Sequence, residues 1–382
     1  MTDPAALDQG EYAYPLHAYA CDACFLVQLE MFETPEAIFR EYAYFSSYST
    51  TWLEHAERYV GKMIAERGIV PGKRVVEIAS NDGYLLQYFR TAGIDVLGVD
   101  PAENVAVVAR ERGVPTLAEF FGIPLAGRVR AERGAADLIV CNNVLAHVPD
   151  INDFVGGLAV LLAPDGFVTI EFPHLMRTIA GVQFDTIYHE HFSYLSLRAL
   201  RPLFKRHGME IFDVEELTTH GGSLRVFAAH TGTRPVMPAV AWVERAEQEA
   251  GLDRVATYTA FAARVVTIKH EFLRFLLKAC ADGATVAGYG AAAKATTLLN
   301  YCGVRADLIA YVADKSPHKQ GRLIPGVRVP IVEPKHLRRR PPDYVVIFPW
   351  NIADEIRGEL ADLRAAGTRF ASAVPALRVD ER

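Results

Sequence analysis

Residues Arg74 to Leu86 read RVVEIASNDGYLL, and this stretch decides the fold. Its first six residues form a β-branched run of strand length, SNDG reads as a turn, and YLLQYFRTAG has helical character. The same order recurs in VLGVD, which ends at Asp100, and in DLIVCNN and GFVTIEFP, with helical stretches near residues 102–112 and 153–162. Strands that alternate with helices predict an α/β domain with a doubly wound parallel sheet.

The turn after the first predicted strand favours one class of cofactor. Ligands of such sheets bind beyond the carboxyl ends of the strands. The turn holds one glycine, Gly83, and lacks the GxGxxG that lets a pyrophosphate approach the backbone. This favours a nucleoside cofactor without phosphates, such as S-adenosylmethionine (SAM), over NAD, although a ribose-binding acid, here Asp100, suits both. The predicted cofactor residues in and after these strands are Glu77, Asn81, Asp82, Gly83, Asp100, Asn142 and Asn143.

Length and composition limit the class of protein. With 382 residues, of which 51% are hydrophobic, the chain has room for two or three domains. A net charge of −6 argues against nucleic acid as a partner. No apolar run reaches the roughly 18 residues of a membrane span, the polar start is unlike a signal peptide, and five cysteines suit a reducing compartment. We therefore expect a cytoplasmic protein with no membrane partner, and we expect a monomer.

A second stretch, QFDTIYHEHFSYLS from Gln183 to Ser196, concentrates side chains suited to acid–base chemistry. It has no clean helical or strand period and is predicted to be a loop, where functional residues often lie. Tyr188, Glu190 and His191 offer a general base, an orienting acid and a donor that stabilises an enolate. A metal site is the alternative, since His189 and His191 form a His-x-His pair.

Cys21 and Cys24 form the one CxxC motif of the chain. Structural zinc takes four protein ligands. His17 offers a third ligand at most, and the sequence suggests no fourth. We therefore expect that zinc binds weakly, or not at all, at Cys21 and Cys24.

The C-terminal part predicts a second alternating domain. TVAGYG, LIAYVAD and YVVIFPW read as strands, with helices near residues 291–301 and 354–365. GYGAAAK places a small-residue turn at a helix N-terminus, where free N–H groups and the helix dipole attract an anion. Lys294 in this turn, with Lys319 and Arg322 in a later loop, predicts a site for a substrate phosphate. A close helix–strand contact with solvated basic residues is the alternative.

Two further strands are expected before this domain. GMEIFDVEEL and GGSLRVFAAH are joined by the short link THGG, which suits an antiparallel pair at the end of a parallel sheet. His220 in that link lies at a strand end and is expected near the same cleft. The long helical region that follows, from about Met237, is expected to start the second domain.

Taken together, the chain closely resembles the bacterial sugar-nucleotide C-methyltransferases of deoxysugar and antibiotic biosynthesis. The resemblance extends from about Tyr14 to the C-terminus and rests on EIASNDGYLL, VLGVDPAENVA, NNVLAHVPDINDF, IEFPHL, QFDTIYHEHFSYLS, THGGSLRV, YGAAAK, TLLNYCG and HKQG. It implies a class I SAM-methyltransferase Rossmann-like domain, a small N-terminal lobe and a C-terminal Rossmann-like domain. The expected boundaries are residues 1–55, 56–235 and 236–382.

The resemblance also implies a reaction, which is methylation by SAM of a carbon beside the ketone of a dTDP-linked 4-keto-deoxysugar, at C3 rather than C5. The implied catalytic residues are Tyr188, Glu190, His191 and His147. The implied substrate contacts are Tyr42, His189, Tyr289, Lys294, Lys319 and Arg322. The chain departs from its relatives in carrying one cysteine pair where they have two, and Ala295-Thr296 where they usually have Gly-Asn.

Alternatives remain open at this stage. His191 is the preferred base because histidine titrates near neutrality, but the sequence also allows the reverse assignment, with Tyr188 as base. The same groups would serve a keto-sugar epimerase, which transfers no methyl. A dehydrogenase is disfavoured by the missing GxGxxG, and a non-catalytic binding protein by the retained acid–base groups.

Overall fold

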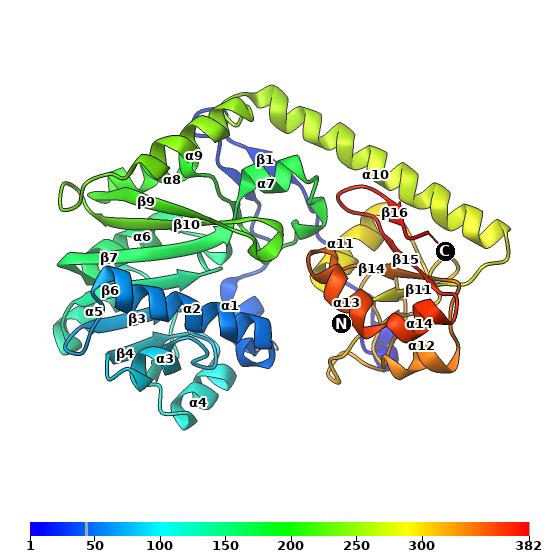
Figure 1. Ribbon diagram of the computed structural model, residues 1–382, viewed down its shortest axis with the longest axis horizontal. Helices are drawn as coiled ribbons and strands as arrows, with labels where there is room; N and C mark the ends of the chain where they lie inside the picture. The colour runs from blue at the N-terminus through cyan, green and yellow to red at the C-terminus, as the bar shows by residue number, and fades with distance from the viewer. Residues whose placement is uncertain (43–44, 382) are drawn as a thin grey trace. The chain divides into compact units, whose positions relative to one another are not determined.

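The computed structural model describes residues 1–42 and 45–381, and it divides into two compact units (Figure 1). Unit 1 consists of Met1–His17, Met176–Tyr188 and Arg254–Arg382. Unit 2 consists of Ala18–Leu175 and His189–Asp253. Each unit is built around its own sheet, so the two are described in turn.

Unit 2 contains a seven-stranded sheet in the order β5-β4-β3-β6-β7-β10-β9. The strands from β5 to β7 run parallel, while β10 pairs antiparallel with both β7 and β9. This confirms the expected doubly wound parallel sheet and its antiparallel end. The strand bounds are β3 Arg74–Ile78, β4 Asp95–Val99, β5 Thr116–Leu117, β6 Ala136–Asn142, β7 Leu162–Pro173, β9 Met209–Leu217 and β10 Ser223–His230.

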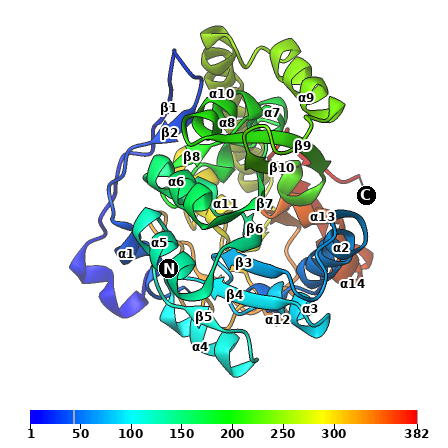
Figure 2. The same ribbon diagram turned by 90° about the vertical axis from the view of Figure 1, so that its left-hand side faces the viewer.

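Helices cover both faces of this sheet, as Figure 2 shows. Neighbouring residues of one strand point to opposite faces, so Val75 packs in the core under α2 and α3, and Val76 in the core under α5 and α6. A sheet buried on both faces is expected of a doubly wound fold. The helix bounds in this unit are α1 Pro35–Phe39, α2 Thr50–Arg67, α3 Leu86–Thr91, α4 Glu103–Glu111, α5 Ile123–Arg133, α6 Ile151–Leu161, α8 Leu197–Arg206 and α9 Pro238–Glu249.

The turn between β3 and α3 is fixed by local geometry. Gly83 has φ +78°, and a Cβ there would lie 3.0 Å from a Val114 methyl, so glycine is required by both conformation and space. The side chain of Ser49 caps α2 by accepting the N–H of Trp52. These features hold the helices that flank the carboxyl edge of the sheet.

A small antiparallel sheet also belongs to unit 2. It comprises β1 (Ala18–Ala20), β2 (Val27–Leu29) and β8 (Ser193–Tyr194) in the order β1-β2-β8. The stretch Gln183–Ser196, expected to be a loop, is therefore irregular except for the short helix η4 (Phe184–Thr186) and the two residues of β8. The pairing of β2 with β8 anchors the end of this stretch to the segment that follows Cys24.

Unit 1 is a second α/β unit with a six-stranded sheet in the order β13-β12-β11-β14-β15-β16. Its strands are parallel except β16. The strand bounds are β11 Val286–Tyr289, β12 Val312–Ala313, β13 Ile331–Val332, β14 Tyr344–Ile347, β15 Arg369–Ser372 and β16 Arg378–Val379. The helix bounds are α10 Val255–Ala281, α11 Ala293–Cys302, α12 Lys335–Arg339, α13 Ala353–Glu359 and α14 Ala361–Ala365, and α7 (Leu175–Ala180) begins at the boundary between the units.

The long helical region from Met237 is two helices that belong to different units. Helix α9 packs Val240 and Val243 into the core of unit 2. Helix α10 places a stripe of apolar residues spaced three and four apart, from Val265 to Ala279, in the core of unit 1. The expected division at residues 55 and 235 stays a prediction.

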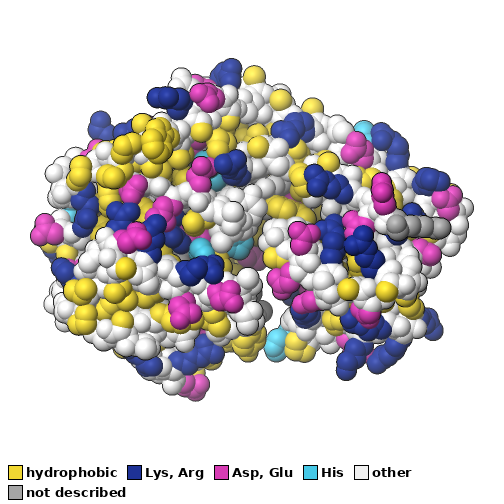
Figure 3. Space-filling view, in the orientation of Figure 1, with side chains coloured by type: hydrophobic (Ala, Val, Ile, Leu, Met, Phe, Trp, Pro, Cys, Tyr) yellow, Lys and Arg dark blue, Asp and Glu magenta, His cyan; other side chains and the backbone are white. Residues whose placement is uncertain are grey.

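The surface carries charged side chains of both signs. On the face drawn in Figure 3, acidic and basic side chains are interspersed. Among the helices of the described residues, none is both long and apolar enough to cross a lipid bilayer.

Candidate functional site

The carboxyl edge of the seven-stranded sheet gathers the predicted cofactor residues. Asp100 follows β4 and is only 5% exposed. Its Oδ2 accepts the N–H of Asn81 at 2.9 Å, and its Oδ1 accepts the N–H of Ala102 at 2.9 Å. Each carboxylate oxygen keeps a second lone pair, so the side chain is fixed and still able to accept hydroxyl groups.

This edge is rich in buried acids. Glu77 is 1% exposed, and burial raises its pKa, with further increases from the charges of Asp100 and Asp82. Burial also raises the pKa of Asp100. One basic partner is close, since Arg112 donates to Asp82 Oδ2 at 2.9 Å. A cationic cofactor such as a sulfonium beside this edge would favour the charged forms of these acids.

Not every predicted cofactor residue points outward. Asp82 is fully buried and accepts hydrogen bonds from Arg112 and Ser47. Asn81 accepts the N–H of Ser46 at 2.9 Å. These two side chains attach the segment before α2 to the β3 turn. Asn142, 8% exposed at the end of β6, lies beside the hydroxyl of Tyr84.

Two predicted catalytic histidines meet where the segment after β6 contacts the stretch Gln183–Ser196. His147 ends the short helix η3 (Leu145–His147), and its ring centroid lies 4.7 Å from that of His191, at an interplanar angle of 72°. His147 Nδ1 lies 2.9 Å from the carbonyl oxygen of Glu190. Because a carbonyl only accepts, Nδ1 carries the proton and Nε2 presents a lone pair.

The protonation of this pair follows from its surroundings. Burial lowers the pKa of His147 to about 4, while the hydrogen bond to the Glu190 carbonyl acts in the opposite direction. Burial raises the pKa of the Glu190 carboxyl. At neutral pH His147 is therefore an uncharged ring with a defined tautomer.

Aromatic contacts connect further predicted residues to this pair. The ring of Phe39 packs edge-on against His147, with ring centroids 5.6 Å apart, and lies tilted against Tyr42, with centroids 6.0 Å apart. The backbone of Tyr42 exchanges two hydrogen bonds with the side chain of Asn104. His189 contacts the ring of Phe32 at 6.1 Å. Tyr188 is the last residue of its unit 1 segment, whereas this cluster belongs to unit 2.

In unit 1, the predicted anion site has a more complex electrostatic setting than expected. Lys294 lies 5.7 Å from the ring centroid of Trp350, and burial lowers its pKa while Asp185 opposes the shift. Trp350 Nε1 donates to Asp185 Oδ2 at 2.8 Å. Burial raises the pKa of Asp185 to about 7. The charge of Lys294 is thus partly compensated within the protein.

The other predicted contacts of unit 1 are dispersed. Lys319 Nζ donates to the carbonyl of Ala291 at 3.0 Å, which places it at the turn between β11 and α11. The Tyr289 hydroxyl donates to Glu359 at 3.3 Å, and Arg322 is exposed. The sequence did not single out Trp350, although its position directly after β14 was a usable signal.

Cys21 and Cys24 lie in a tight turn. The N–H groups of Cys24 and Ala23 lower the pKa of the Cys21 thiol. Over residues 1–42 and 45–381, no group of three or more His, Cys, Asp or Glu side chains is arranged to hold a metal ion. The prediction of weak or absent zinc therefore stands as a prediction.

Comparison with known proteins decides the family. The C-methyltransferase NovU of Streptomyces niveus is 38% identical over 371 residues, which cover 97% of this chain and 88% of that protein. This chain belongs to the C-methyltransferase family. The resemblance to C-methyltransferases that the sequence indicated is thereby confirmed. This chain is a SAM-dependent C-methyltransferase.

Family models divide the C-methyltransferase along its length. A methyltransferase domain matches residues 52–214, which supports the expected class I fold, and a C-methyltransferase C-terminal domain matches residues 218–375. A zinc-binding domain model matches residues 2–39, the region of the CxxC motif.

Other known proteins are similar to part of this chain. The ubiquinone biosynthesis O-methyltransferase of Bordetella avium is 33% identical over 103 residues, 26% of this chain and 43% of that protein. The SAM-bound magnesium protoporphyrin IX methyltransferase of Synechocystis PCC 6803 is 18% identical with a TM-score of 0.36, covering 47% of this chain and 79% of that one.

Proposed function

We propose that this C-methyltransferase methylates a dTDP-linked 4-keto-deoxysugar at a carbon beside its ketone, at C3 rather than C5, through an enolate. The observation that carries the proposal is the edge-to-face pair of His147 and His191, which follows the strand β6 that ends in the proposed cofactor residues. Carbon is a poor nucleophile unless a neighbouring ketone acidifies it, so a base beside the cofactor is the expected requirement.

The chain supplies the groups that such a reaction needs. When bound, SAM supplies an electrophilic methyl group on a sulfonium. His191 removes the proton from the carbon beside the ketone, and the electron pair of that C–H bond forms the enolate. His147, neutral and accepting at Nε2, orients the His191 ring. Tyr188 donates to the enolate oxygen. The enolate carbon would then bond to that methyl group as the methyl–sulfur bond breaks, and the electron pair of the broken bond would stay on the sulfur as a thioether.

In this proposal unit 1 binds the nucleotide. The N–H groups at the start of α11 and the ammonium of Lys319 favour the diphosphate. Lys294 contributes a positive charge that Asp185 moderates. Tyr289 and Arg322 are further proposed contacts, and Tyr42 and His189 are proposed to face the sugar.

The test is incubation with methyl-labelled SAM and a panel of dTDP-4-keto-deoxysugars, with and without an amino group. The expected product carries one additional methyl group, and NMR assigns it to C3. Epimerisation would change the stereochemistry without adding label. Transfer to C5 would correct the regiochemistry. If no sugar of the panel gains label while the same enzyme methylates a different acceptor, the proposed substrate class is refuted.

A further inference from the structure

The turn between β9 and β10 has a conformation that its sequence makes costly. His220, in the short helix η5 (Thr219–Gly221), has φ +52° and ψ 22°. The next two residues, Gly221 and Gly222, also have positive φ, which glycine adopts freely. A non-glycine residue is rarely held in this left-handed region, and such residues cluster at functional sites.

Strained residues gather at one edge of the sheet in unit 2. Ala79 (φ 55°) and Asn81 (φ 49°) follow β3, and Asn143 (φ 54°) follows β6. His220 adjoins β10, whose partner β7 is the neighbour of β6. The proposed cofactor residues belong to the same edge. The conformation of His220 is thus part of a pattern that coincides with the candidate site.

His220 is in contact with that site. Its Nε2 lies 3.4 Å from Nδ2 of Asn143, the residue directly after β6. Its ring lies 5.5 Å from that of Trp52, which in turn stacks on His55 at 4.9 Å. The backbone N–H of Asn143 donates to the carbonyl of Glu171 at 2.7 Å. His55, on which Trp52 stacks, is also bonded to Glu171, so both neighbours of His220 are connected to this residue of β7.

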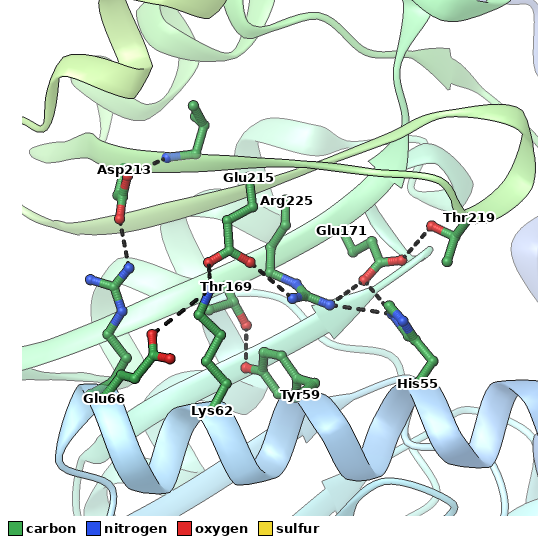
Figure 4. Close-up of polar contacts among 12 residues, drawn as sticks. His55, Tyr59, Lys62, Glu66, Thr169, Glu171, Asp213, Glu215, Thr219 and Arg225 are labelled. Atoms are coloured by element: carbon green, nitrogen blue, oxygen red, sulfur yellow. Dashed lines mark hydrogen bonds and ion pairs between the residues drawn. The ribbon is translucent and has the colours of Figure 1, made fainter.

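Glu171 connects the same elements through its side chain (Figure 4). Its Oε1 accepts the Thr219 hydroxyl at 2.9 Å, and its Oε2 accepts His55 Nε2 at 2.9 Å and Arg225 at 2.6 Å. Arg225 also donates to Glu215. One carboxylate therefore joins α2, β10 and the η5 turn, with Glu171 itself on β7.

Burial makes this arrangement rigid. Glu171 is fully buried and Arg225 is 3% exposed. Burial alone would raise the pKa of Glu171, but the hydrogen bond from His55 and the charge of Arg225 lower it to about 2. A buried ion pair of this kind is a poor source of net stability and is better explained by a demand for a defined geometry.

We propose that His220 faces the methyl acceptor as a further hydrogen-bonding residue of the site, and that Glu171, through Thr219 and His55, is the residue that positions it. The inference rests on the proposed function. The strand order supplies the direction: the ribose acid belongs to β4, the SNDG turn to β3 and Asn142 to β6. A cofactor that spans β4 to β6 leaves its reactive end facing β7 and β10, where His220 lies.

The first experiment replaces His220 by Asn, which tolerates the left-handed conformation and so preserves the turn. SAM affinity by calorimetry is expected to stay within about twofold, because the cofactor contacts are elsewhere. The kcat/KM for methyl transfer to the dTDP-4-keto sugar is expected to fall by roughly 10–100-fold, the usual cost of a misplaced reactant. Asp213→Asn is the control. Asp213 lies on β9 and pairs with Arg67 of α2, so this change breaks an ion pair but should leave kcat/KM unchanged.

The second experiment separates positioning from folding. Thr219→Val removes the hydroxyl that Glu171 accepts but keeps the shape, and it is expected to lower kcat roughly tenfold. Thr219→Ser keeps the hydroxyl and is expected to restore wild-type kcat. Full activity of both His220→Asn and Thr219→Val refutes the proposed role of His220 but leaves the proposed function of the enzyme untouched. A wild-type enzyme that methylates no sugar of the panel refutes the acceptor and this inference together.

Discussion

Among the proposed cofactor residues, Asp100 has the most closely defined side-chain geometry. Both of its carboxylate oxygens accept a backbone N–H. In Asp100→Asn one oxygen becomes an NH2 group that faces an N–H donor, so the side chain must rotate or lose a bond. We expect SAM affinity to weaken by roughly 1.5–3 kcal/mol, measured by calorimetry.

The control for Asp100 lies at the other end of β4, the strand that Asp100 follows. Asp95 begins β4 at its opposite end, where it pairs with Arg74 at the surface. Asp95→Asn should leave SAM affinity unchanged. Equal affinities of all three proteins would remove Asp100 from the cofactor site.

The pH dependence of turnover should distinguish the two histidines. The pKa of His147 is about 4 because burial disfavours its cation, so this ring is already neutral above pH ~5 and cannot produce a rise in rate near pH 7. A base at His191 should give a rate that rises through a pKa near neutrality. His191→Asn should abolish that limb and slow the chemical step by roughly 10²–10⁴-fold.

Two variants complete this experiment. His147→Asn should slow turnover but keep the limb near neutrality. Solvent hydrogen exchange at the acidic carbon, measured with a cofactor analogue that cannot transfer a methyl, should be slow in His191→Asn. If the limb persists there and exchange stops only in Tyr188→Phe, then Tyr188 is the base.

Residues at strand ends could be predicted from the sequence, and residues held by remote partners could not. The positions of Asn81 and Asp100 follow from the alternation of strands and helices, because every strand of a parallel sheet exposes its carboxyl end at one edge. That Asp82 pairs with Arg112 depends on packing. The sequence predicted that Lys294 binds a substrate phosphate, with a solvated cation as the alternative, and it did not indicate that Asp185 and Trp350, far away in the chain, lie next to it.

At the scale of elements, one carboxylate holds two helices and a strand end together. Glu247 of α9 is 1% exposed, and its oxygens accept His174 Nε2 and the N–H groups of Leu197 and Arg198 at the start of α8. Glu247→Ala removes a helix cap and leaves a buried imidazole unpaired. We expect the free energy of unfolding to fall by about 2–4 kcal/mol, measured by urea denaturation.

The matched variant is one turn earlier on the same helix. Glu244 pairs with Arg201 at the surface, and both side chains are more than a third exposed. Glu244→Ala should cost at most about 1 kcal/mol, because exposed ion pairs contribute little. Equal losses for the two variants would mean that the buried hydrogen bonds of Glu247 stabilise the fold no more than the exposed ion pair of Glu244 does.

The break between α9 and α10 shows a limit of pattern-based prediction. Residues 238–281 have helical propensity almost throughout, and the sequence suggested one helical region that opens the second domain. The structure ends α9 at Glu249 and begins α10 at Val255. Propensity does not tell which sheet an apolar stripe packs against, so Val240 and Val265 enter different cores for reasons that the local sequence does not contain.

At the scale of the whole molecule, SAM should stabilise one unit selectively. A ligand at about 100 times its Kd stabilises the folded state that binds it by about 2.7 kcal/mol. All proposed cofactor residues belong to unit 2. We expect SAM to slow amide hydrogen exchange in β3, β4 and β6 and to leave β11, β14 and α11 unchanged. Asp100→Asn protein at the same SAM concentration is the control, and equal slowing in both units would contradict the assignment.

The boundary between the units falls inside the stretch Gln183–Ser196, after Tyr188, and the chain passes from one unit to the other four times. A single genetic crossover therefore cannot exchange one intact unit between two related enzymes. With the nucleotide bound by unit 1, as we propose, grafting a new nucleotide specificity would require the simultaneous transfer of residues 1–17, 176–188 and 254–382. Tyr188 would come from the donor enzyme and His191 from the recipient. Every such chimaera would therefore also combine two proposed catalytic residues of the stretch Gln183–Ser196 from different enzymes.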